Sequence, residues 1–245
     1  LASATPLFVA AVNGDTEMVA ELLKAGANPN TPSTGGLGML FSRAPLYAAA
    51  ENGRTEMVAE LLKAGANPST PLTFGLGMLT SVTPLYAAAQ FGHTRVVAEL
   101  LKAGANPNTP HTFGLGMLFS ETPLFVAAVN GRTEMVAELL KAGANPNTPY
   151  TLGLGMLRSA TPLRAAANQG RTEVVAELLK AGANPSTPFT RGLGMLFSDT
   201  PLYTAAAKGR TEVVAALLKA GANPNTPDAL VLGMLASSTS LRAAA

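Results

Sequence analysis

The residue types that carry most enzyme and metal chemistry are scarce in this chain of 245 residues. It has no cysteine and only two histidines, His93 and His111, and no serine or carboxylate stands at a recognised catalytic spacing from either of them. A metal site needs several convergent ligands, and the lack of cysteine excludes disulfides, thiolate metal sites and a cysteine nucleophile. We therefore expect a protein that is not an enzyme and that holds no cofactor and no metal.

The remaining chemical signals are also weak. The Gly-Leu-Gly strings, such as residues 36–38, lack the strand–GxGxxG–helix context of a dinucleotide site. With 13% charged residues and a net charge of +2, the chain carries no strong acidic or basic field. No apolar run approaches the roughly 18 residues that a membrane helix needs. We expect no membrane-spanning segment.

A period of 39 residues organises the whole chain. The tripeptide Thr-Pro-Leu, or a close variant of it, begins at Thr5, Ala44, Thr83, Thr122, Thr161 and Thr200, with a degenerate copy at Thr239. Fixed periods of roughly 20–50 residues indicate solenoids, propellers or arrays. We assign a single repeat domain over 1–245, with six repeats that start at 1, 40, 79, 118, 157 and 196 and a partial repeat over 235–245. Because the chain stops inside an expected helix, we expect it to be part of a longer array.

Each repeat encodes two short helices. In the first repeat, Thr5 is a good N-cap, proline follows it at the first helical position, and Gly14 ends the segment. The next helix starts at Thr16, has an acidic residue in its first turn and stops at Gly26. Helices of about eight and ten residues are too short to be stable alone in water. They must be stabilised by stacking on neighbouring repeats.

The segment between one helix pair and the next, residues 27–43 in the first copy, is here called the finger. Two prolines and a pair of glycines argue against a helix and favour an extended hairpin or an ordered loop. Leu37, Met39 and Leu40 return in this segment from copy to copy. We expect them to pack finger on finger, since recurrent apolar residues usually belong to the core. A row that contacts a lipid or a partner is the alternative.

The pattern TPLxxAAxxGxTExVxxLLxxGAxxN resembles the ankyrin repeat and covers about 25 of every 39 residues in all six copies. The resemblance implies an all-α solenoid of ankyrin-like helix–turn–helix repeats with long β-hairpin-like finger loops. It also implies a non-enzymatic, monomeric and cytoplasmic domain that binds a protein partner through a concave surface of finger tips and first helices. This chain departs from the family in having six extra finger residues. It also lacks the family's histidine after Thr-Pro-Leu.

Differences among the six copies fall at few positions. The polar stripe of the second helix, Glu17, Glu21 and Lys24 in the first copy, changes elsewhere only at Arg95 and Ala216. Variation instead lies beside Thr-Pro-Leu, on the exposed face of the first helix and in the finger, and all 13 aromatic residues lie there. Aromatic residues and arginine are enriched at binding hot spots. The predicted partner-binding residues are Phe41, Arg43, Tyr47, Glu51, Leu72, Phe74, Val82, Tyr86, Gln90, Phe91, His111, Phe113, Phe119, Glu121, Phe125, Tyr150, Leu152, Arg158, Arg164, Asn168, Phe189, Arg191, Phe197, Asp199 and Tyr203.

Other interpretations of these residues stay open. The aromatics after Thr-Pro-Leu, such as Tyr47, could fill the groove between finger and first helix as ordinary packing. His93 replaces an arginine found in four other copies and is expected to be an exposed turn residue. A purely structural array would show no excess of variation on one face. Nucleic-acid binding would use a basic stretch that acidic residues interrupt; its basic residues are Arg158, Arg164, Arg191 and Lys208, and the acidic ones are Glu51, Glu121 and Asp199. The sequence favours a protein-binding scaffold of a diversified recognition type.

Overall fold

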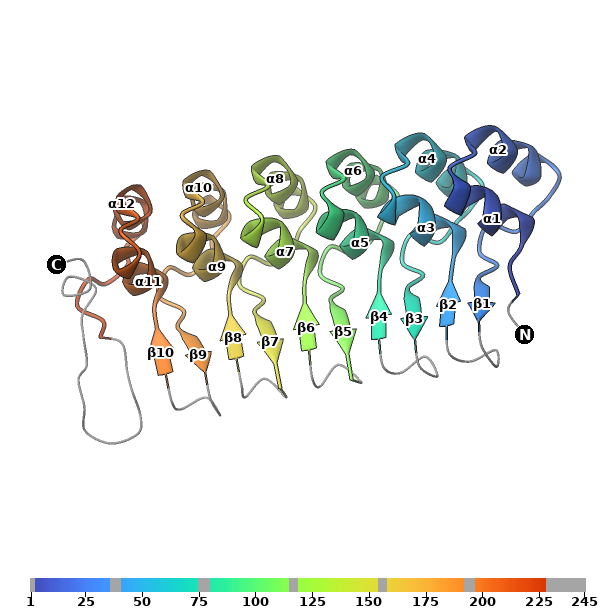
Figure 1. Ribbon diagram of the computed structural model, residues 1–245. Helices are drawn as coiled ribbons and strands as arrows, with labels where there is room; N and C mark the ends of the chain where they lie inside the picture. The colour runs from blue at the N-terminus through green and yellow to red at the C-terminus, as the bar shows by residue number, and fades with distance from the viewer. Residues whose placement is uncertain are drawn as a thin grey trace. The chain divides into compact units, whose positions relative to one another are not determined.

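A computed structural model describes residues 3–35, 41–74, 80–114, 119–153, 158–191 and 197–227. The chain forms two compact units, Leu1–Gly116 and Met117–Ala245, and each is described by itself. Both consist of helix pairs joined by two-stranded fingers, and within each unit the first helices lie between the strands and the second helices (Figure 1). The partial repeat expected at 235–245 lies outside the described residues.

The helices alternate between a first and a second member of each pair. In the first unit they are α1 (Pro6–Asn13), α2 (Thr16–Lys24), α3 (Pro45–Glu51), α4 (Thr55–Lys63), α5 (Pro84–Phe91) and α6 (Thr94–Lys102). In the second unit they are α7 (Pro123–Val129), α8 (Thr133–Lys141), α9 (Pro162–Gln169), α10 (Thr172–Lys180), α11 (Pro201–Ala207) and α12 (Thr211–Lys219). All are seven to nine residues long, which agrees with the lengths expected from the sequence.

The sequence signals that begin and end the first helices work as expected. Each first helix starts at the proline of the repeated tripeptide, and the Thr5 hydroxyl accepts a hydrogen bond from the Phe8 N–H at 3.1 Å. Ala44 replaces this threonine before α3, which therefore has no side-chain cap. Gly14 ends α1 with a φ of 82°, a conformation that glycine adopts without strain.

The fingers are antiparallel β-hairpins that pair with one another. The strands of the first unit are β1 (Ser33–Gly35), β2 (Phe41–Arg43), β3 (Leu72–Phe74), β4 (Thr80–Val82) and β5 (His111–Phe113). Those of the second are β6 (Phe119–Glu121), β7 (Tyr150–Leu152), β8 (Arg158–Ala160), β9 (Phe189–Arg191) and β10 (Phe197–Asp199). Within each unit every strand pairs with the next, both inside a finger and between fingers. The expected hairpin arms are confirmed, whereas Leu37, Met39 and Leu40 lie outside the described residues and their ladder stays a prediction.

The core of each unit runs between successive helix pairs. Leu46 and Leu85 of the first helices and Met57 and Leu61 of the second are fully buried, and the alanines of the first helices let α1, α3 and α5 approach closely. Met18, which is equivalent to Met57, is half exposed. The reason is that α2 packs mainly on α1 and α4, whereas α4 packs on α2, α3 and α6.

Polar contacts between repeats explain the constant stripe of the second helices. The Thr133 hydroxyl donates a hydrogen bond of 3.2 Å to the Glu173 carboxylate, and Thr172 donates an equivalent bond of 3.2 Å to Glu212. Inside a helix, the constant lysine pairs with the glutamate three residues before it, as Lys63 does with Glu60. These contacts give the near-constancy of the stripe a structural cause.

His93 also joins two repeats, so the expectation of an exposed turn residue is wrong. Its side chain is half-buried, and its Nε2 lies 3.0 Å from the Glu51 carbonyl oxygen. Because that oxygen can only accept, Nε2 carries the hydrogen. The ring lies over Gly53, whose φ is 70°, and a Cβ added there would come within 2.5 Å of the ring. Arg54 and Arg171 cover Gly14 and Gly131 in the same way.

We predict that Gly53→Ala destabilises the protein more than Gly65→Ala. Both glycines have a left-handed φ, so each alanine costs about 1 kcal/mol from backbone strain. Only at Gly53 does the new methyl group displace His93 and its hydrogen bond, which adds about 1 kcal/mol. Denaturant unfolding of both variants measures the difference, and adding His93→Ala to each should abolish the excess. Equal losses for the two glycine variants would show that the His93 contact contributes nothing.

Candidate functional site

The strands sort the variable positions by the face on which they lie. Directly paired residues share a face of an antiparallel sheet, and successive residues of a strand alternate between faces. The middle residue of every strand is threonine or serine, and we call this the constant face: Thr34, Ser42, Thr73, Ser81 and Thr112 in the first unit, and Ser120, Thr151, Ser159, Thr190 and Ser198 in the second. The two end residues of each strand lie on the opposite, variable face.

The variable face has two rows. The inner row, next to the helices, consists of Ser33, Arg43, Leu72, Val82 and His111 in the first unit and of Glu121, Tyr150, Ala160, Phe189 and Asp199 in the second. The outer row, nearer the finger tips, consists of Gly35, Phe41, Phe74, Thr80 and Phe113 in the first unit and of Phe119, Leu152, Arg158, Arg191 and Phe197 in the second. Sixteen of the twenty are predicted site residues.

The inner row of the first unit packs on the first helices. The Arg43 guanidinium lies 5.9 Å from the Phe8 ring centroid and 5.4 Å from that of Tyr47, and it forms an ion pair with Glu51 of α3. Burial, and to a smaller extent the nearby Glu51, raise the pKa of the Tyr47 phenol to about 12, and Arg43 opposes the shift. These contacts join β2 to α1 and α3.

In the second unit, aromatic stacking joins the inner row to a first helix. Tyr150 of β7 stacks on Phe125 of α7 with a centroid separation of 5.2 Å and an interplanar angle of 19°. The Phe119 ring meets Tyr150 edge-on at 5.6 Å. Burial is the main cause that raises the pKa of the Tyr150 phenol. Phe125 belongs to a buried cluster with Ala160 and Ala165.

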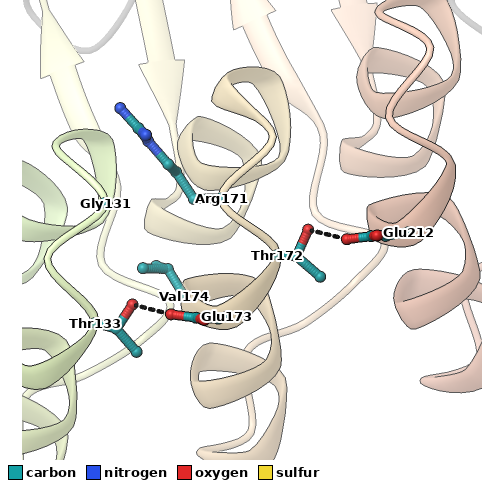
Figure 2. Close-up of a pocket in the computed structure, with 7 residues that line it drawn as sticks. All are labelled: Gly131, Thr133, Arg171, Thr172, Glu173, Val174 and Glu212. Carbon is teal, nitrogen blue, oxygen red and sulfur yellow. Dashed lines mark hydrogen bonds between the residues drawn. The ribbon is translucent and has the colours of Figure 1, made fainter.

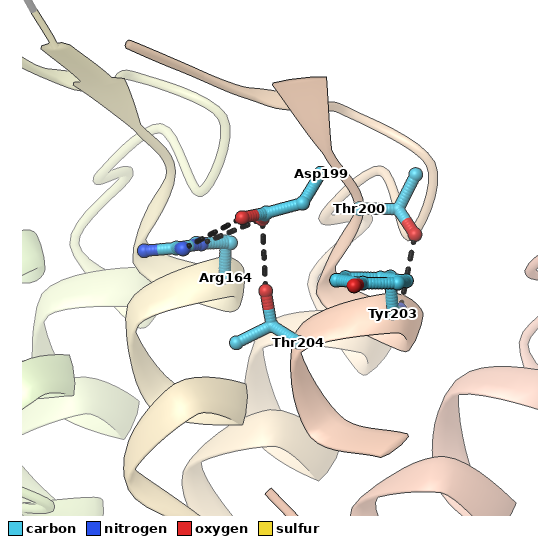
Figure 3. A network of polar contacts seen from close by, with 5 residues as sticks. All are labelled: Arg164, Asp199, Thr200, Tyr203 and Thr204. Carbon is cyan, nitrogen blue, oxygen red and sulfur yellow. Dashed lines mark hydrogen bonds and ion pairs between the residues drawn. The ribbon is translucent and has the colours of Figure 1, made fainter. Parts of the chain in front are cut away.

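A charged version of this contact follows one repeat further along (Figure 3). Arg164 of α9 donates two hydrogen bonds of 3.1 Å to the Asp199 carboxylate of β10, and Thr204 donates a third to the same group at 2.8 Å. The guanidinium also lies 3.9 Å from the centroid of the Phe189 ring. Arg164 and Asp199 are only 18% and 22% exposed, so this network fixes β9 and β10 to α9 and α11.

Burial therefore separates two groups among the predicted site residues. The aromatics after Thr-Pro-Leu fall on the packing side, since Tyr47, Tyr86 and Phe125 are buried and Tyr203 is half-buried. The helical pattern missed this because strands of the finger cover the side of the first helix that faces away from its partner helix. These aromatics pack within the domain and offer little surface to a partner. The charges of Arg43, Glu51, Arg164 and Asp199 are likewise satisfied inside the chain.

The outer row carries the exposed members of the set. Phe74 is 54% exposed and Phe113 is 47% exposed, and Arg158 and Arg191 are exposed as well. Phe41, Phe119 and Leu152 are half-buried beside them, and Phe41 is the cross-strand partner of Phe74. On the first helices, Gln90 and Phe91 are exposed and Asn168 is half-buried. The inner-row residues Leu72, His111, Glu121 and Phe189 are half-buried and Val82 is buried.

A groove on the opposite, second-helix side is structural. In Figure 2, Thr133 and Glu173 and then Thr172 and Glu212 bridge the starts of α8, α10 and α12, and the groove between them has a volume of about 400 Å³. A second groove of about 320 Å³ repeats one period later with equivalent residues. Because the hydroxyls and carboxylates that line the grooves bond to one another, the grooves follow from the stacking of repeats.

Within the described ranges, no group of three or more histidine, aspartate or glutamate residues could hold a metal ion. The same residues include no helix long and apolar enough to cross a membrane. Sequence reasoning missed the constant Thr/Ser face and the outer-row residue Thr80. The sequence did contain a signal for the constant face. Each finger arm alternates variable, constant and variable residues, as in Leu72-Thr73-Phe74, and this alternation has the two-residue period of a strand.

Helix pairs that repeat every 39 residues, joined by paired hairpins, define an ankyrin repeat solenoid. The chain belongs to the ankyrin repeat family: three copies of the family model for ankyrin repeats match residues 2–71, 75–150 and 152–228. Domains of this family are generally protein–protein interaction modules and are typically not catalytic.

Solved structures share the fold along the whole chain. The crystal structure of the human ASB11 ankyrin repeat domain is 26% identical, with a TM-score of 0.66, and the match covers 99% of this chain and 92% of that one. The ankyrin repeat domain of Bcl-3, described as a unique member of the IkappaB protein family, is 22% identical, with a TM-score of 0.68 and coverage of 99% and 95%. The search of curated proteins gave no match.

We predict that Arg164→Phe alone destabilises the protein and that adding Asp199→Ala restores most of the loss. The single change leaves Asp199 half-buried without its two guanidinium bonds, at a cost of about 1–3 kcal/mol. The double change reproduces the Phe125 and Ala160 combination one repeat earlier. Denaturant unfolding of both variants checks this, and additive losses would contradict the coupling.

A second prediction concerns pH. His111 lies against the Tyr86 ring at 4.8 Å, and burial lowers its pKa below the usual 6.5. The unfolded chain then binds the proton more readily, so stability is complete above pH 6.5 and falls as the pH drops toward the folded-state pKa. His111→Leu, which copies Leu72 of the preceding repeat, should flatten the melting temperature between pH 7 and 5. An unchanged pH profile in this variant would disprove the assignment.

Proposed function

We propose that this protein binds a protein partner through the outer row of its fingers. In the first unit the contact residues are Phe74 and Phe113, with Phe41 beside them and Gln90 and Phe91 on α5 as further exposed variable positions. In the second unit they are Leu152, Arg158 and Arg191. The chain acts as a binding scaffold and performs no chemistry on its partner.

One observation carries this proposal: the two faces of the same strands differ in how much they vary. At the outer end of the descending arm the five described copies hold Gly35, Phe74, Phe113, Leu152 and Arg191. The adjacent residue, on the other face, is threonine in all five copies. Both sets belong to the same three-residue strands and share the same backbone pairing, and the threonines are themselves half exposed. Drift after duplication would alter both faces, so selection on the outer row accounts for the contrast better.

The physical chemistry of the outer row suits recognition. An exposed phenylalanine on a paired strand offers a large apolar area, and its two side-chain torsions cost little entropy when they are fixed. Phe74 is held between its cross-strand neighbours Phe41 and Thr80, so its backbone is already ordered before binding. These properties are typical of residues that dominate the affinity of an interface.

The two alternatives are less well supported. A purely structural array explains the inner row, where each variable residue packs inside the domain, but it does not explain two half-exposed phenylalanines among changing neighbours. Arg164 is not available to bind a nucleic acid, because its charge is neutralised by Asp199. The net charge of +2 gives no basic surface of the extent that phosphate binding requires.

We predict that the double variant Phe74→Ser/Phe113→Ser loses a partner that the unchanged chain captures from its native source. Quantitative mass spectrometry identifies proteins retained by one and not by the other, and the purified candidate is then titrated against both. Loss of two exposed aromatic contacts should weaken binding by about 30-fold or more. The melting temperature should change little, because neither side chain is in the core.

The constant face provides the matched control. Thr73→Ser/Thr112→Ser changes the adjacent residues of the same strands and removes one methyl group from each, and it should leave the affinity unchanged. Equal loss of binding in the control, or full binding by the phenylalanine variant, would show that the interface does not lie on the outer row.

A further inference from the structure

We infer that Arg158 and Arg191 form a two-guanidinium clamp for a carboxylate side chain of the protein partner. The inference rests on the proposed binding function and adds to it the chemistry of the segment that docks on the second unit. It is carried by the position of these two arginines in the sheet and by the way neighbouring acidic groups are used.

The two arginines face each other across adjacent strands. Arg158 of β8 is the direct register partner of Arg191 of β9, with Ser159 opposite Thr190 next to them. Directly paired residues have Cβ atoms about 4.5–5.5 Å apart, and like charges at that spacing are destabilising. Both side chains are exposed, and neither forms an ion pair with the part of the chain that the structure describes. The pair therefore has a built-in preference for an anion.

No acidic residue of the same fingers supplies that anion. Asp199, on β10, already accepts two bonds from Arg164 and one from Thr204. It also lies in the inner row, opposite Phe189, whereas Arg158 and Arg191 lie in the outer row. The two positive charges of the outer row thus stay available to a ligand from outside the chain.

The surroundings favour a carboxylate of a protein over a nucleic-acid phosphate. Guanidinium groups bind carboxylates with two parallel hydrogen bonds, and two facing guanidiniums can hold one carboxylate between them. Leu152 is the cross-strand partner of Arg158 on its other side, so the clamp has an apolar neighbour. A nucleic acid needs several phosphate contacts along a continuous basic track, and this pair stands next to an apolar side chain. We therefore expect a glutamate or aspartate followed by an apolar residue.

A defined peptide tests the clamp without the natural partner. The probe is an acetylated and amidated Gly-Glu-Glu-Leu-Gly peptide, and Gly-Gln-Gln-Leu-Gly is its uncharged counterpart. Titration into the ¹⁵N-labelled intact chain should shift the Nε–Hε signals of Arg158 and Arg191 with the first peptide only. Raising the salt concentration should weaken the binding. If both peptides shift the signals equally, or neither does, the inference is wrong.

Matched variants assign the effect to these two side chains. Arg158→Gln and Arg191→Gln should each weaken binding of the glutamate peptide about tenfold or more, since each removes charge-assisted hydrogen bonds. Lys208→Gln removes an exposed positive charge from the end of α11 in the same unit and should have no effect. If Lys208→Gln weakened binding as much, the peptide would be responding to the general positive charge of the unit, and the clamp would be disproved.

The charge repulsion can be tested without any ligand. Arg158→Glu places a carboxylate opposite Arg191, so it should raise the melting temperature by about 1–3 °C and abolish binding of the glutamate peptide. A lower melting temperature in this variant would show that the two arginines do not repel each other, and the argument would fail.

Two further measurements separate this inference from the proposed function. A ten-nucleotide oligothymidylate that shifts the two arginines more strongly than the glutamate peptide would replace the carboxylate by a phosphate and overturn the clamp. A natural partner that depends on Phe74 and Phe113 but binds Arg158→Gln/Arg191→Gln normally would also disprove the clamp, and it would leave the proposed function standing. The variant Phe74→Ser/Phe113→Ser should still bind the glutamate peptide.

Discussion

Burial between successive repeats is the interaction on which the structure of each unit depends. Helices of seven to nine residues have too few internal hydrogen bonds to be stable in water, so each pair must bury its leucines and alanines against the next pair. The polar contacts follow the same direction along the chain. Thr133 reaches Glu173 in the next repeat, and His93 reaches back to the Glu51 carbonyl. Contacts of this kind give a structural role to residues that are themselves partly exposed.

The two-residue period of a strand divides the variable positions into two classes. A side chain in the inner row must fit the first helix that it covers, so its changes are matched by changes on that helix: Tyr150 stacks on Phe125, whereas Phe189 lies under Arg164, whose charge is balanced by Asp199. In the outer row, Phe74, Phe113, Arg158 and Arg191 are exposed instead. Variation in the first class maintains packing, whereas the proposed binding role rests on variation in the second.

Local signals in the sequence were sufficient to predict the helices and finger arms, but not to predict which side chains of different elements pack together. Thr5, Pro6 and Gly14 place the ends of α1 correctly because capping and glycine conformation are local properties. The burial of Tyr86 could not be predicted from its helix, since the groups that cover it belong to β5, about 25 residues further along. Variation among copies marked the inner and outer rows alike as candidate binding residues, because a matched internal pair varies as much as a free surface position. The alternation of variable and constant residues within each finger arm contained the missing distinction.

This division lets binding chemistry change without a cost to the fold. The backbone of each outer-row residue is fixed by pairing on both sides, while its side chain makes little contact with the core, so a phenylalanine and an arginine are about equally compatible with the strand. The first unit accordingly presents Phe41, Phe74 and Phe113 at the same register at which the second presents Leu152, Arg158 and Arg191. Even two arginines in direct opposition are tolerated there, because their repulsion is small compared with the burial that holds the repeats together. A ligand carboxylate that binds between the two arginines would relieve this repulsion.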